Sequence, residues 1–203
     1  MNYFVTAIDT DSGKTLVSAI MCEALQADYW KPVQAGFSRD ADTLKNLISN
    51  KKTRIHPETY LLTAPASPHA SAKLDNIEIR LDQFKIPETS NHLIIEGAGG
   101  CLVPLNDRYF VIDLMQQLNA EIILVADLYL GSINHTLLTL EALKKRNLKI
   151  KGIIFNGESN SESERIIMLH SSLPCLLRVN KEKMIDQSVI KKYAQLLKAN
   201  WNE

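Results

Sequence analysis

The residues best suited to chemistry lie near the N-terminus, in the stretch Ala7-Ile8-Asp9-Thr10-Asp11-Ser12-Gly13-Lys14-Thr15. Their types follow the phosphate-binding pattern Gly-x-x-x-x-Gly-Lys-Ser/Thr, except that Ala7 replaces the first glycine. In this pattern, loop N–H groups and the positive end of the following helix hold phosphate oxygens. Lys14 would reach the β- and γ-phosphates, and the Thr15 hydroxyl would bind Mg²⁺. The pattern favours a nucleotide site over an ordinary strand-to-helix turn.

Two further strand ends carry charged residues. Glu96 ends the apolar run Leu93-Ile94-Ile95 and precedes Gly97-Ala98-Gly99-Gly100, where the backbone can approach a ligand closely. An acidic residue here is typical of a second metal-binding carboxylate. Lys31 follows another apolar run, and two lysines facing one site would suit a heavily anionic ligand. The alternatives are a solvated Glu96 in a glycine-rich turn and a solvated Lys31.

Two helix starts offer weaker signals. Asp40 and Asp42 head a helical pattern, where carboxylates favour the helix dipole, and either could also bind metal. Ser132-Ile133-Asn134 opens another helix, whose free N–H groups would suit a substrate carboxylate. Simple capping by Ser132 explains that position equally well.

The elements that must position these residues alternate along the chain. Apolar runs predict strands at residues 3–7, 29–33, 93–96, 121–126, 150–155 and 175–177. Helical patterns cover residues 14–27, 40–49, 69–74, 79–84, 111–118, 133–146, 161–169 and 189–199. Strands that are apolar on both faces belong to parallel sheets covered by helices. We therefore predict a single-domain, three-layer α/β fold over residues 1–203, with ligands at the carboxyl ends of the strands.

Composition narrows the class of partner. The chain has 203 residues, is 45% hydrophobic, and balances 23 basic against 23 acidic residues, so it has no field that would attract nucleic acid or an anionic membrane. It shows neither the pattern of a signal peptide nor an apolar run of about 20 residues. Three scattered cysteines without a Cys-x-x-Cys pair suggest reduced thiols. We expect a cytoplasmic protein.

Five blocks together resemble the dethiobiotin synthetases of the P-loop NTPase superfamily, in the same order along the chain. The resemblance runs from Tyr3 to about Asn156, roughly three quarters of the sequence. The blocks are Thr10-Asp11-Ser12-Gly13-Lys14-Thr15, Lys31-Pro32-Val33-Gln34, Ser67-Pro68-His69, Glu96-Gly97-Ala98-Gly99-Gly100 and Leu130-Gly131-Ser132-Ile133-Asn134-His135.

This resemblance implies a homodimeric ligase of biotin biosynthesis that uses 7,8-diaminononanoate, CO₂, ATP and Mg²⁺. One amine of the substrate becomes a carbamate, which attacks the γ-phosphate. The second amine then closes the ring of the carbamic–phosphoric anhydride, giving dethiobiotin, ADP and phosphate. Phosphoryl transfer of this kind needs positioning and charge stabilisation more than a protein nucleophile.

The resemblance also assigns residues. Lys14 and Lys31 would neutralise the carbamate and the transferring phosphoryl group. Magnesium would be held by Thr15, Asp42 and Glu96, with Asp42 preferred to Asp40 because Asp42-Thr43-Leu44 matches the family's Asp-x-Leu. Asn156 would read adenine. The substrate would contact Lys31, Ala35 and, across the dimer, Ser132, Ile133 and Asn134. The nucleotide and its metal would be bound by Thr10, Asp11, Ser12, Gly13, Lys14, Thr15, Leu16, Asp42, Glu96, Gly97, Ala98, Gly99 and Asn156.

The sequence departs from the family at three places. Ala7 would cost about 1 kcal/mol if the loop required a positive φ there. Ala35 stands where the family often has a small hydroxyl residue, so its contact would be through the backbone. Leu177-Arg178-Val179-Asn180 replaces the stretch that helps to read the base, which predicts weaker discrimination between nucleotides.

Two alternatives come from other functional classes. A ParA/MinD-like switch ATPase usually has an additional lysine at the start of the loop, where this chain has Ala7-Ile8-Asp9. A degenerate nucleotide-binding module would explain Ala7 and the altered C-terminal stretch, but the intact Lys14, Lys31 and Glu96 argue against it.

Overall fold

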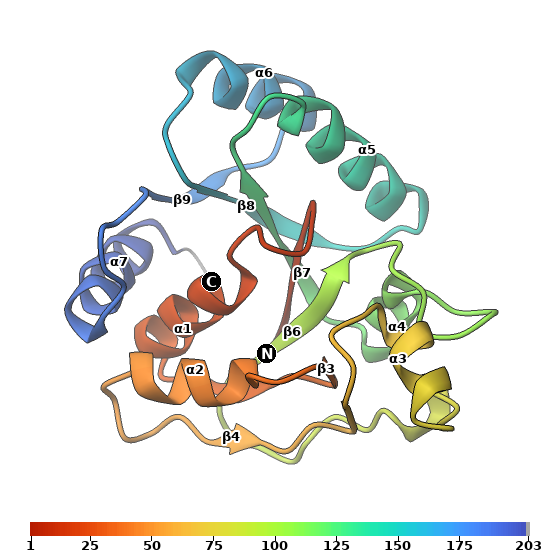
Figure 1. The fold of residues 1–203 in the computed structure, drawn as a ribbon. Coiled ribbons are helices and arrows are strands. Elements are labelled where there is room, and N and C mark those ends of the chain that lie inside the picture. The colour runs from red at the N-terminus through yellow and green to blue at the C-terminus, as the bar shows by residue number, and fades with distance from the viewer. Residues whose placement is uncertain (202–203) are drawn as a thin grey trace.

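A seven-stranded parallel sheet forms the centre of the molecule (Figure 1). The computed structural model describes residues 1–201. The strand order is β4-β2-β6-β1-β7-β8-β9, and every neighbouring pair is parallel. The strands are β1 (Asn2–Ala7), β2 (Asp28–Trp30), β4 (Ile55–His56), β6 (Leu93–Gly100), β7 (Glu121–Asp127), β8 (Ile150–Asn156) and β9 (Cys175–Val179). A second, two-stranded parallel sheet pairs β3 (Val33–Ala35) with β5 (Tyr60–Leu62).

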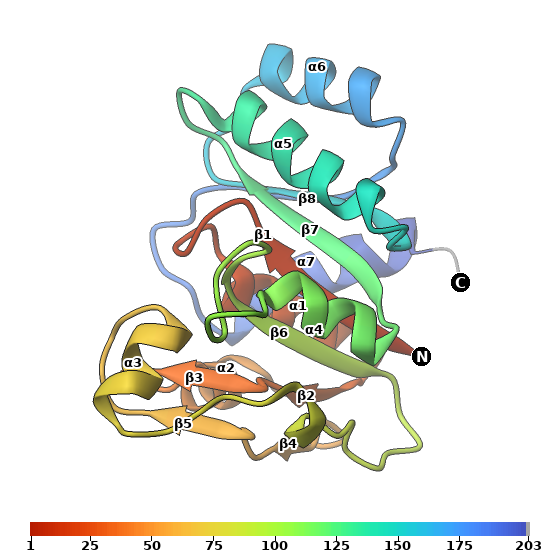
Figure 2. The same ribbon diagram turned by 90° about the vertical axis from the view of Figure 1, so that its right-hand side faces the viewer.

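Helices cover both faces of the large sheet (Figure 2). On one face lie α1 (Lys14–Leu25), α2 (Asp40–Leu47) and α7 (Gln187–Asn200), and on the other α4 (Val111–Leu118), α5 (Ser132–Lys145) and α6 (Ser161–Ser171). The short α3 (Pro68–Leu74) lies against the small sheet. Side chains alternate along β1, so that Tyr3 and Val5 pack in the core beneath α1 and α7 while Phe4 packs beneath α4. The strand is therefore apolar on both faces, as a covered parallel strand must be.

The predicted fold class is confirmed, and most elements differ from the prediction only at their ends. The single strand expected at residues 29–33 is wrong: β2 ends at Trp30, and β3 begins at Val33 in the small sheet. Pro32 lies between them, where its missing N–H excludes it from a ladder. The helix expected at residues 79–84 is only a 3₁₀ turn, Leu81–Gln83. The short strands β4 and β5 were not predicted. Over residues 1–201, no helix has the length and apolar character needed to cross a bilayer.

Candidate active site

The predicted phosphate-binding loop connects β1 to the start of α1. Gly13 has φ +93° and caps α1, and a Cβ at this position would collide with the amide of Asn156. Asn156 in turn donates from Nδ2 to the Ser12 carbonyl at 2.9 Å, so β8 supports the loop from the side. Ala7 lies in β1 with strand geometry, and the backbone strain considered for this position therefore does not arise.

A cavity of about 660 Å³ opens beside this loop, at the carboxyl ends of the central strands. Five of its lining residues come from four separate segments. The loop and α1 contribute Lys14 and Thr15, the chain after β2 contributes Lys31, α2 contributes Asp40, and β6 contributes Glu96. These five residues bring two cations, two carboxylates and a hydroxyl together in one cavity, from segments that parallel pairing and helix packing place side by side.

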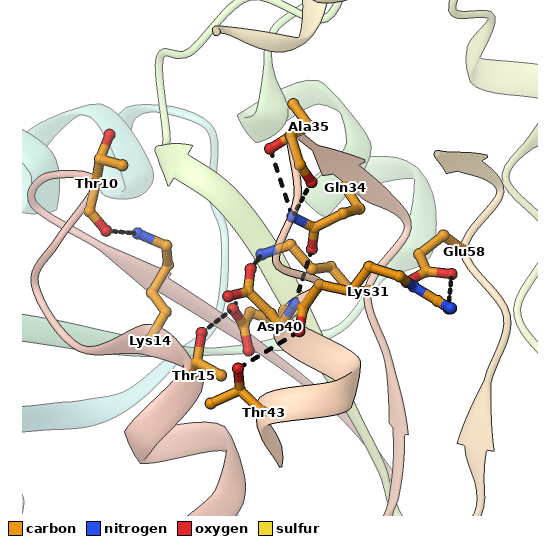
Figure 3. Close-up of polar contacts among 12 residues, drawn as sticks. Thr10, Lys14, Thr15, Lys31, Gln34, Ala35, Asp40, Thr43 and Glu58 are labelled. Atoms are coloured by element: carbon orange, nitrogen blue, oxygen red, sulfur yellow. Dashed lines mark hydrogen bonds and ion pairs between the residues drawn. The ribbon is translucent and has the colours of Figure 1, made fainter. Parts of the chain in front are cut away.

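Glu96 is the centre of this group and is only 1% exposed. Its Oε1 accepts hydrogen bonds from the Thr15 hydroxyl at 2.8 Å and from Lys31 Nζ at 3.0 Å. Its Oε2 accepts a hydrogen bond from the Tyr29 hydroxyl at 3.0 Å. Lys31 also forms an ion pair with Asp40, as Figure 3 shows. The buried carboxylate is therefore fully hydrogen-bonded, which buried charges require.

Burial and neighbouring charges shift the pKa values of the site in different directions. Burial lowers the pKa of Lys14 to about 8, opposed by the attraction of Glu96 and reinforced by the repulsion of Lys31. Burial also disfavours the charged form of Lys31, but Glu96 and Asp40 outweigh it and raise the pKa of this lysine. Burial, with a contribution from Glu96, raises the pKa of Tyr29, so its phenol remains a donor. Lys14 meanwhile donates to the carbonyls of Asp9 and Thr10, each at 2.8 Å, and Figure 3 shows the contact with Thr10.

The structure favours Asp40 over Asp42 as the carboxylate of α2 that faces the cavity. Asp40 lines the cavity, whereas Asp42 is exposed on the outer side of the helix. Gln34 fixes the start of this helix, because its Oε1 accepts the Asp40 N–H at 3.1 Å and its Nε2 donates to the Gly36 carbonyl at 3.2 Å (Figure 3). Asp42 therefore stays an untested prediction, and the site proposed below uses Asp40 because it lines the cavity.

Most other expected site residues line the same cavity. Those that line it are Thr10, Asp11, Gly13, Lys14, Thr15, Lys31, Ala35, Glu96, Ala98 and Gly99, together with Ser67 and Pro68. Within residues 1–201 the cavity wall does not include Ser12, Leu16, Asp42, Gly97, Asn156, Ser132, Ile133 or Asn134. Ser132, Ile133 and Asn134 begin α5, beyond the end of β7, so this chain does not bring them to its own cavity.

Sequence reasoning missed two residues that organise the site, Tyr29 and Gln34. A signal existed for the first, since Tyr29 precedes Lys31 by two residues and extended chain places such residues on one face. Gln34 belonged to a recognised block, but nothing in the sequence indicated that it would accept the N–H that begins α2.

The donor set fits magnesium. Mg²⁺ takes oxygen ligands and usually keeps several waters beside one or two carboxylates and substrate phosphates. Thr15, Asp40 and Glu96 offer a hydroxyl and two carboxylates in one cavity. Among residues 1–201, no three side chains of His, Cys, Asp or Glu come together as a metal cage. An ion here would therefore draw further ligands from a bound nucleotide and from water.

Known proteins match this chain along nearly its whole length. The family model described as an AAA domain matches residues 1–189. A protein of Cytophaga hutchinsonii named ATP-dependent dethiobiotin synthetase BioD is 56% identical over 203 residues, covering 99% of this chain and 98% of the relative. A protein of Christiangramia forsetii with the same name is 45% identical over 196 residues, covering 96% and 94%.

Solved structures show a similar fold in more distant proteins. A ParA family ATPase from Chlorobium tepidum matches with a TM-score of 0.61 and 15% identity, covering 98% of this chain and 92% of its own. The septum site-determining protein MinD from Pyrococcus horikoshii matches with a TM-score of 0.56 and 16% identity, covering 96% and 95%. At these identities the likeness concerns the fold alone. On its sequence relatives, the chain belongs to the ATP-dependent dethiobiotin synthetase family of ligases.

Proposed function

We propose that residues 1–203 form one catalytic unit that makes dethiobiotin from 7,8-diaminononanoate, CO₂ and ATP, with Mg²⁺, in biotin biosynthesis. The observation that carries this proposal is the cavity in which buried Lys14 and Lys31 face the carboxylates of Glu96 and Asp40. Two buried ammonium groups suit a ligand set with several negative charges, such as nucleotide phosphates beside a carbamate. The relatives named dethiobiotin synthetase support the choice of substrate.

Lys14 would bind the phosphates of ATP through its ammonium group. Its ammonium group now donates to the carbonyls of Asp9 and Thr10, two acceptors in the loop that would surround those phosphates. Exchange of neutral carbonyls for phosphate oxygens would strengthen the interaction, because the ammonium group would then face full negative charges. With a pKa of about 8, Lys14 is mostly protonated at neutral pH and ready for this exchange.

Lys31 would stabilise the negative charge of the carbamate and of the phosphoryl group that the carbamate attacks. The carbamate oxygen attacks the γ-phosphorus, the bond to the β-phosphate oxygen breaks, and ADP leaves. The second amine then attacks the carbamic carbon, loses its proton and expels phosphate, which closes the ring. Glu96 and Asp40 keep the pKa of Lys31 high, so its ammonium group is charged before the substrates bind. Its positive charge would offset the charge that builds up on the transferring oxygens.

Magnesium would be held by Thr15, Asp40 and Glu96, with Asp40 in place of Asp42. When bound, the ion supplies charge neutralisation to the β- and γ-phosphate oxygens. Glu96 Oε1 now bonds Thr15 and Lys31, and Asp40 bonds Lys31. Lys31 thus occupies the space between the two carboxylates, and its release from them would place its ammonium group nearer the substrate.

The start of α5 would bind the substrate carboxylate from the partner subunit of a homodimer. Ser132 is buried at this helix start, and its hydroxyl oxygen has no hydrogen-bond partner. Leu130 is fully exposed beside it, and Leu138 on α5 is also exposed. Exposed apolar side chains around a helix terminus suit a subunit interface. The balanced charge of the chain agrees with small-molecule substrates in the cytoplasm rather than nucleic acid or a membrane.

Adenine would lie beside Asn156, which already contacts the loop through Ser12. The departure at Leu177-Arg178-Val179-Asn180 lies in and after β9, where Arg178 forms an ion pair with Glu164 and lies over the Phe155 ring. We expect comparable turnover with ATP, CTP and GTP, measured as phosphate release. Strict dependence on ATP would contradict weaker base discrimination without affecting the proposed reaction.

The test of the reaction is phosphate release from ATP and Mg²⁺, with and without 7,8-diaminononanoate and bicarbonate. We expect release to require both co-substrates and to fall by roughly 100-fold or more in Lys31→Ala, as the loss of a transition-state charge contact does. Lys191→Ala, an exposed lysine on α7, is the matched control and should retain activity. Release that is indifferent to the diamine would contradict the proposal and favour a switch ATPase.

A further inference from the structure

We infer that the Tyr29 hydroxyl is a positioning group for Glu96, holding one carboxylate oxygen inward so that the other faces the magnesium and phosphate site. The inference rests on the proposed function, because it assigns Tyr29 a part in that reaction. Tyr29 is not itself a catalytic residue, since it acts only through Glu96.

The sheet register brings the two side chains together. Tyr29 on β2 pairs with Ile94 on β6, and Glu96 follows Ile94 by two residues, so all three side chains lie on the same face of the sheet. The Tyr29 ring is fully buried in the core beneath α1. A ring packed in this way has little freedom, and its hydroxyl oxygen lies 3.0 Å from Glu96 Oε2.

The partners of the two carboxylate oxygens differ in kind. Thr15 and Lys31, which bond Oε1, both line the cavity and can exchange Glu96 for a ligand. Tyr29, which bonds Oε2, lies behind the cavity wall in the core. Ligand binding can therefore change the environment of Oε1 while Oε2 remains anchored.

Such an anchor has a physical purpose. The terminal torsion of a glutamate is broad, so an unanchored carboxylate rotates easily between orientations. A hydrogen bond on Oε2 selects the orientation in which Oε1 faces the cavity. Phenylalanine would fill the same core space, whereas a buried hydroxyl is costly unless it is bonded. The hydroxyl is therefore explained by Glu96 and not by packing.

The experiment compares Tyr29→Phe with the wild-type chain by calorimetric titration with ADP, with Mg²⁺ and with a chelator. We expect the gain in ADP affinity that Mg²⁺ provides to fall roughly three- to tenfold in Tyr29→Phe, the range expected for the loss of one typical intramolecular hydrogen bond. Affinity without Mg²⁺ should stay the same. Tyr193→Phe is the matched control, because it removes another buried hydroxyl that donates to a carboxylate, Glu182, at 2.6 Å. In Tyr193→Phe the increase in ADP affinity that Mg²⁺ provides, here called the magnesium gain, should equal that of the wild type.

A double-mutant cycle separates positioning from packing. In a Glu96→Gln background, Tyr29→Phe should have no further effect on the magnesium gain. A packing role would instead lower the melting temperature in both backgrounds and leave the gain unchanged, and that result would overturn the inference. Equal effects with and without Glu96 would overturn it as well.

The same titration distinguishes this inference from the proposed function. If the wild type shows no magnesium gain, both the proposed metal site and the role of Tyr29 are wrong. If the wild type shows the gain but forms no dethiobiotin, the proposed reaction fails, while the gain in Tyr29→Phe still decides whether Tyr29 positions Glu96.

Discussion

Asp28 and Glu96 are both buried carboxylates on neighbouring strands, yet their surroundings differ completely. Asp28, at the start of β2, accepts hydrogen bonds from the Arg54 N–H at 2.9 Å, the Thr89 hydroxyl at 2.7 Å and the Asn91 amide at 3.0 Å. Arg54 directly precedes the edge strand β4, and Thr89 and Asn91 precede β6, so these hydrogen bonds hold both segments against the start of β2. Glu96, at the carboxyl end of β6, is bonded by Lys31 and Thr15, which line the cavity.

We interpret this difference as one between a carboxylate that stabilises the fold and a carboxylate placed for the proposed reaction. The partners of Asp28 are a backbone N–H, a hydroxyl, an amide and the His56 ring, and none of these groups lines the cavity. The donors of Glu96 include a charged ammonium group that a phosphate or carbamate can take over. Burial alone therefore does not identify a functional group, whereas burial among exchangeable charged partners at the ligand end of a parallel sheet does.

The largest effect should come from Glu96→Gln, which keeps the shape of the side chain and removes its charge. We expect kcat to fall on the order of 100-fold, because the metal and Lys31 both lose their central anion. The free energy of unfolding should change little, since Lys31 retains Asp40. Steady-state kinetics and urea unfolding measure the two quantities. A variant with normal kcat would contradict the functional role of Glu96.

Asp28→Asn should show the opposite pattern. The amide cannot accept all the hydrogen bonds that reach the carboxylate, so we expect the free energy of unfolding to fall by about 2 kcal/mol. Below the unfolding transition, kcat should remain within about twofold of the wild type, because no part of Asp28 reaches the cavity.

Urea unfolding tests this second prediction, with Asp82→Asn as the control. Asp82 is exposed and forms a surface ion pair with Arg80, and exposed pairs of this kind contribute little to stability. If Asp28→Asn lost activity without losing stability, the division between the two carboxylates would be wrong.

Asp40 and Asp42 offer a smaller contrast within one helix. Asp40→Asn removes an ion-pair partner of Lys31 and a proposed magnesium ligand, so we expect kcat/KM to fall about tenfold. Asp42→Asn alters an exposed carboxylate, so its kcat/KM should stay within about twofold of the wild-type value. Kinetics at several Mg²⁺ concentrations would compare the two. A larger loss in Asp42→Asn would restore the original family-based assignment.

The smallest effect concerns acid stability. Burial alone would raise the pKa of Asp28, but the hydrogen bonds from Arg54, Asn91, Thr89 and His56 outweigh it and hold the pKa below its ordinary value of 3.8. A depressed pKa contributes stability that is present above the unfolded-state value and is lost as pH falls through the folded-state value. The difference in unfolding free energy between the wild type and Asp28→Asn should therefore shrink below about pH 4. A difference that stays constant from pH 7 to pH 3 would contradict this account of Asp28.

Much of this arrangement could be predicted from the sequence, because it depends on local order along the chain. Lys14, Lys31 and Glu96 each lie at or just beyond the end of an apolar run, and parallel pairing places such ends together. The choice between Asp40 and Asp42 depended on the rotation of α2. Ala41 and Leu44 are its buried residues, and Asp40 lies one turn before Leu44. Helical periodicity therefore puts Asp40 rather than Asp42 on the side of α2 that faces the cavity, although the family pattern favoured Asp42.

Other features depend on contacts between distant segments. Tyr29 could be recognised as a partner of Glu96 only once the β2–β6 register was known. The strand β4 has only two residues and pairs with β2 alone, so it is too short to give an apolar run from which a strand could be predicted. The chain passes from one sheet to another at Pro32, and the single strand predicted at residues 29–33 ran across this break.

The most direct test of the central claim follows carbon from bicarbonate into product. Wild-type protein is incubated with ATP, Mg²⁺, 7,8-diaminononanoate and carbon-13-labelled bicarbonate, and dethiobiotin and ADP are measured by mass spectrometry. The account predicts one labelled carbon in each dethiobiotin and equal amounts of dethiobiotin and ADP. ADP formed at the same rate without the diamine, with no labelled dethiobiotin in its presence, would contradict it.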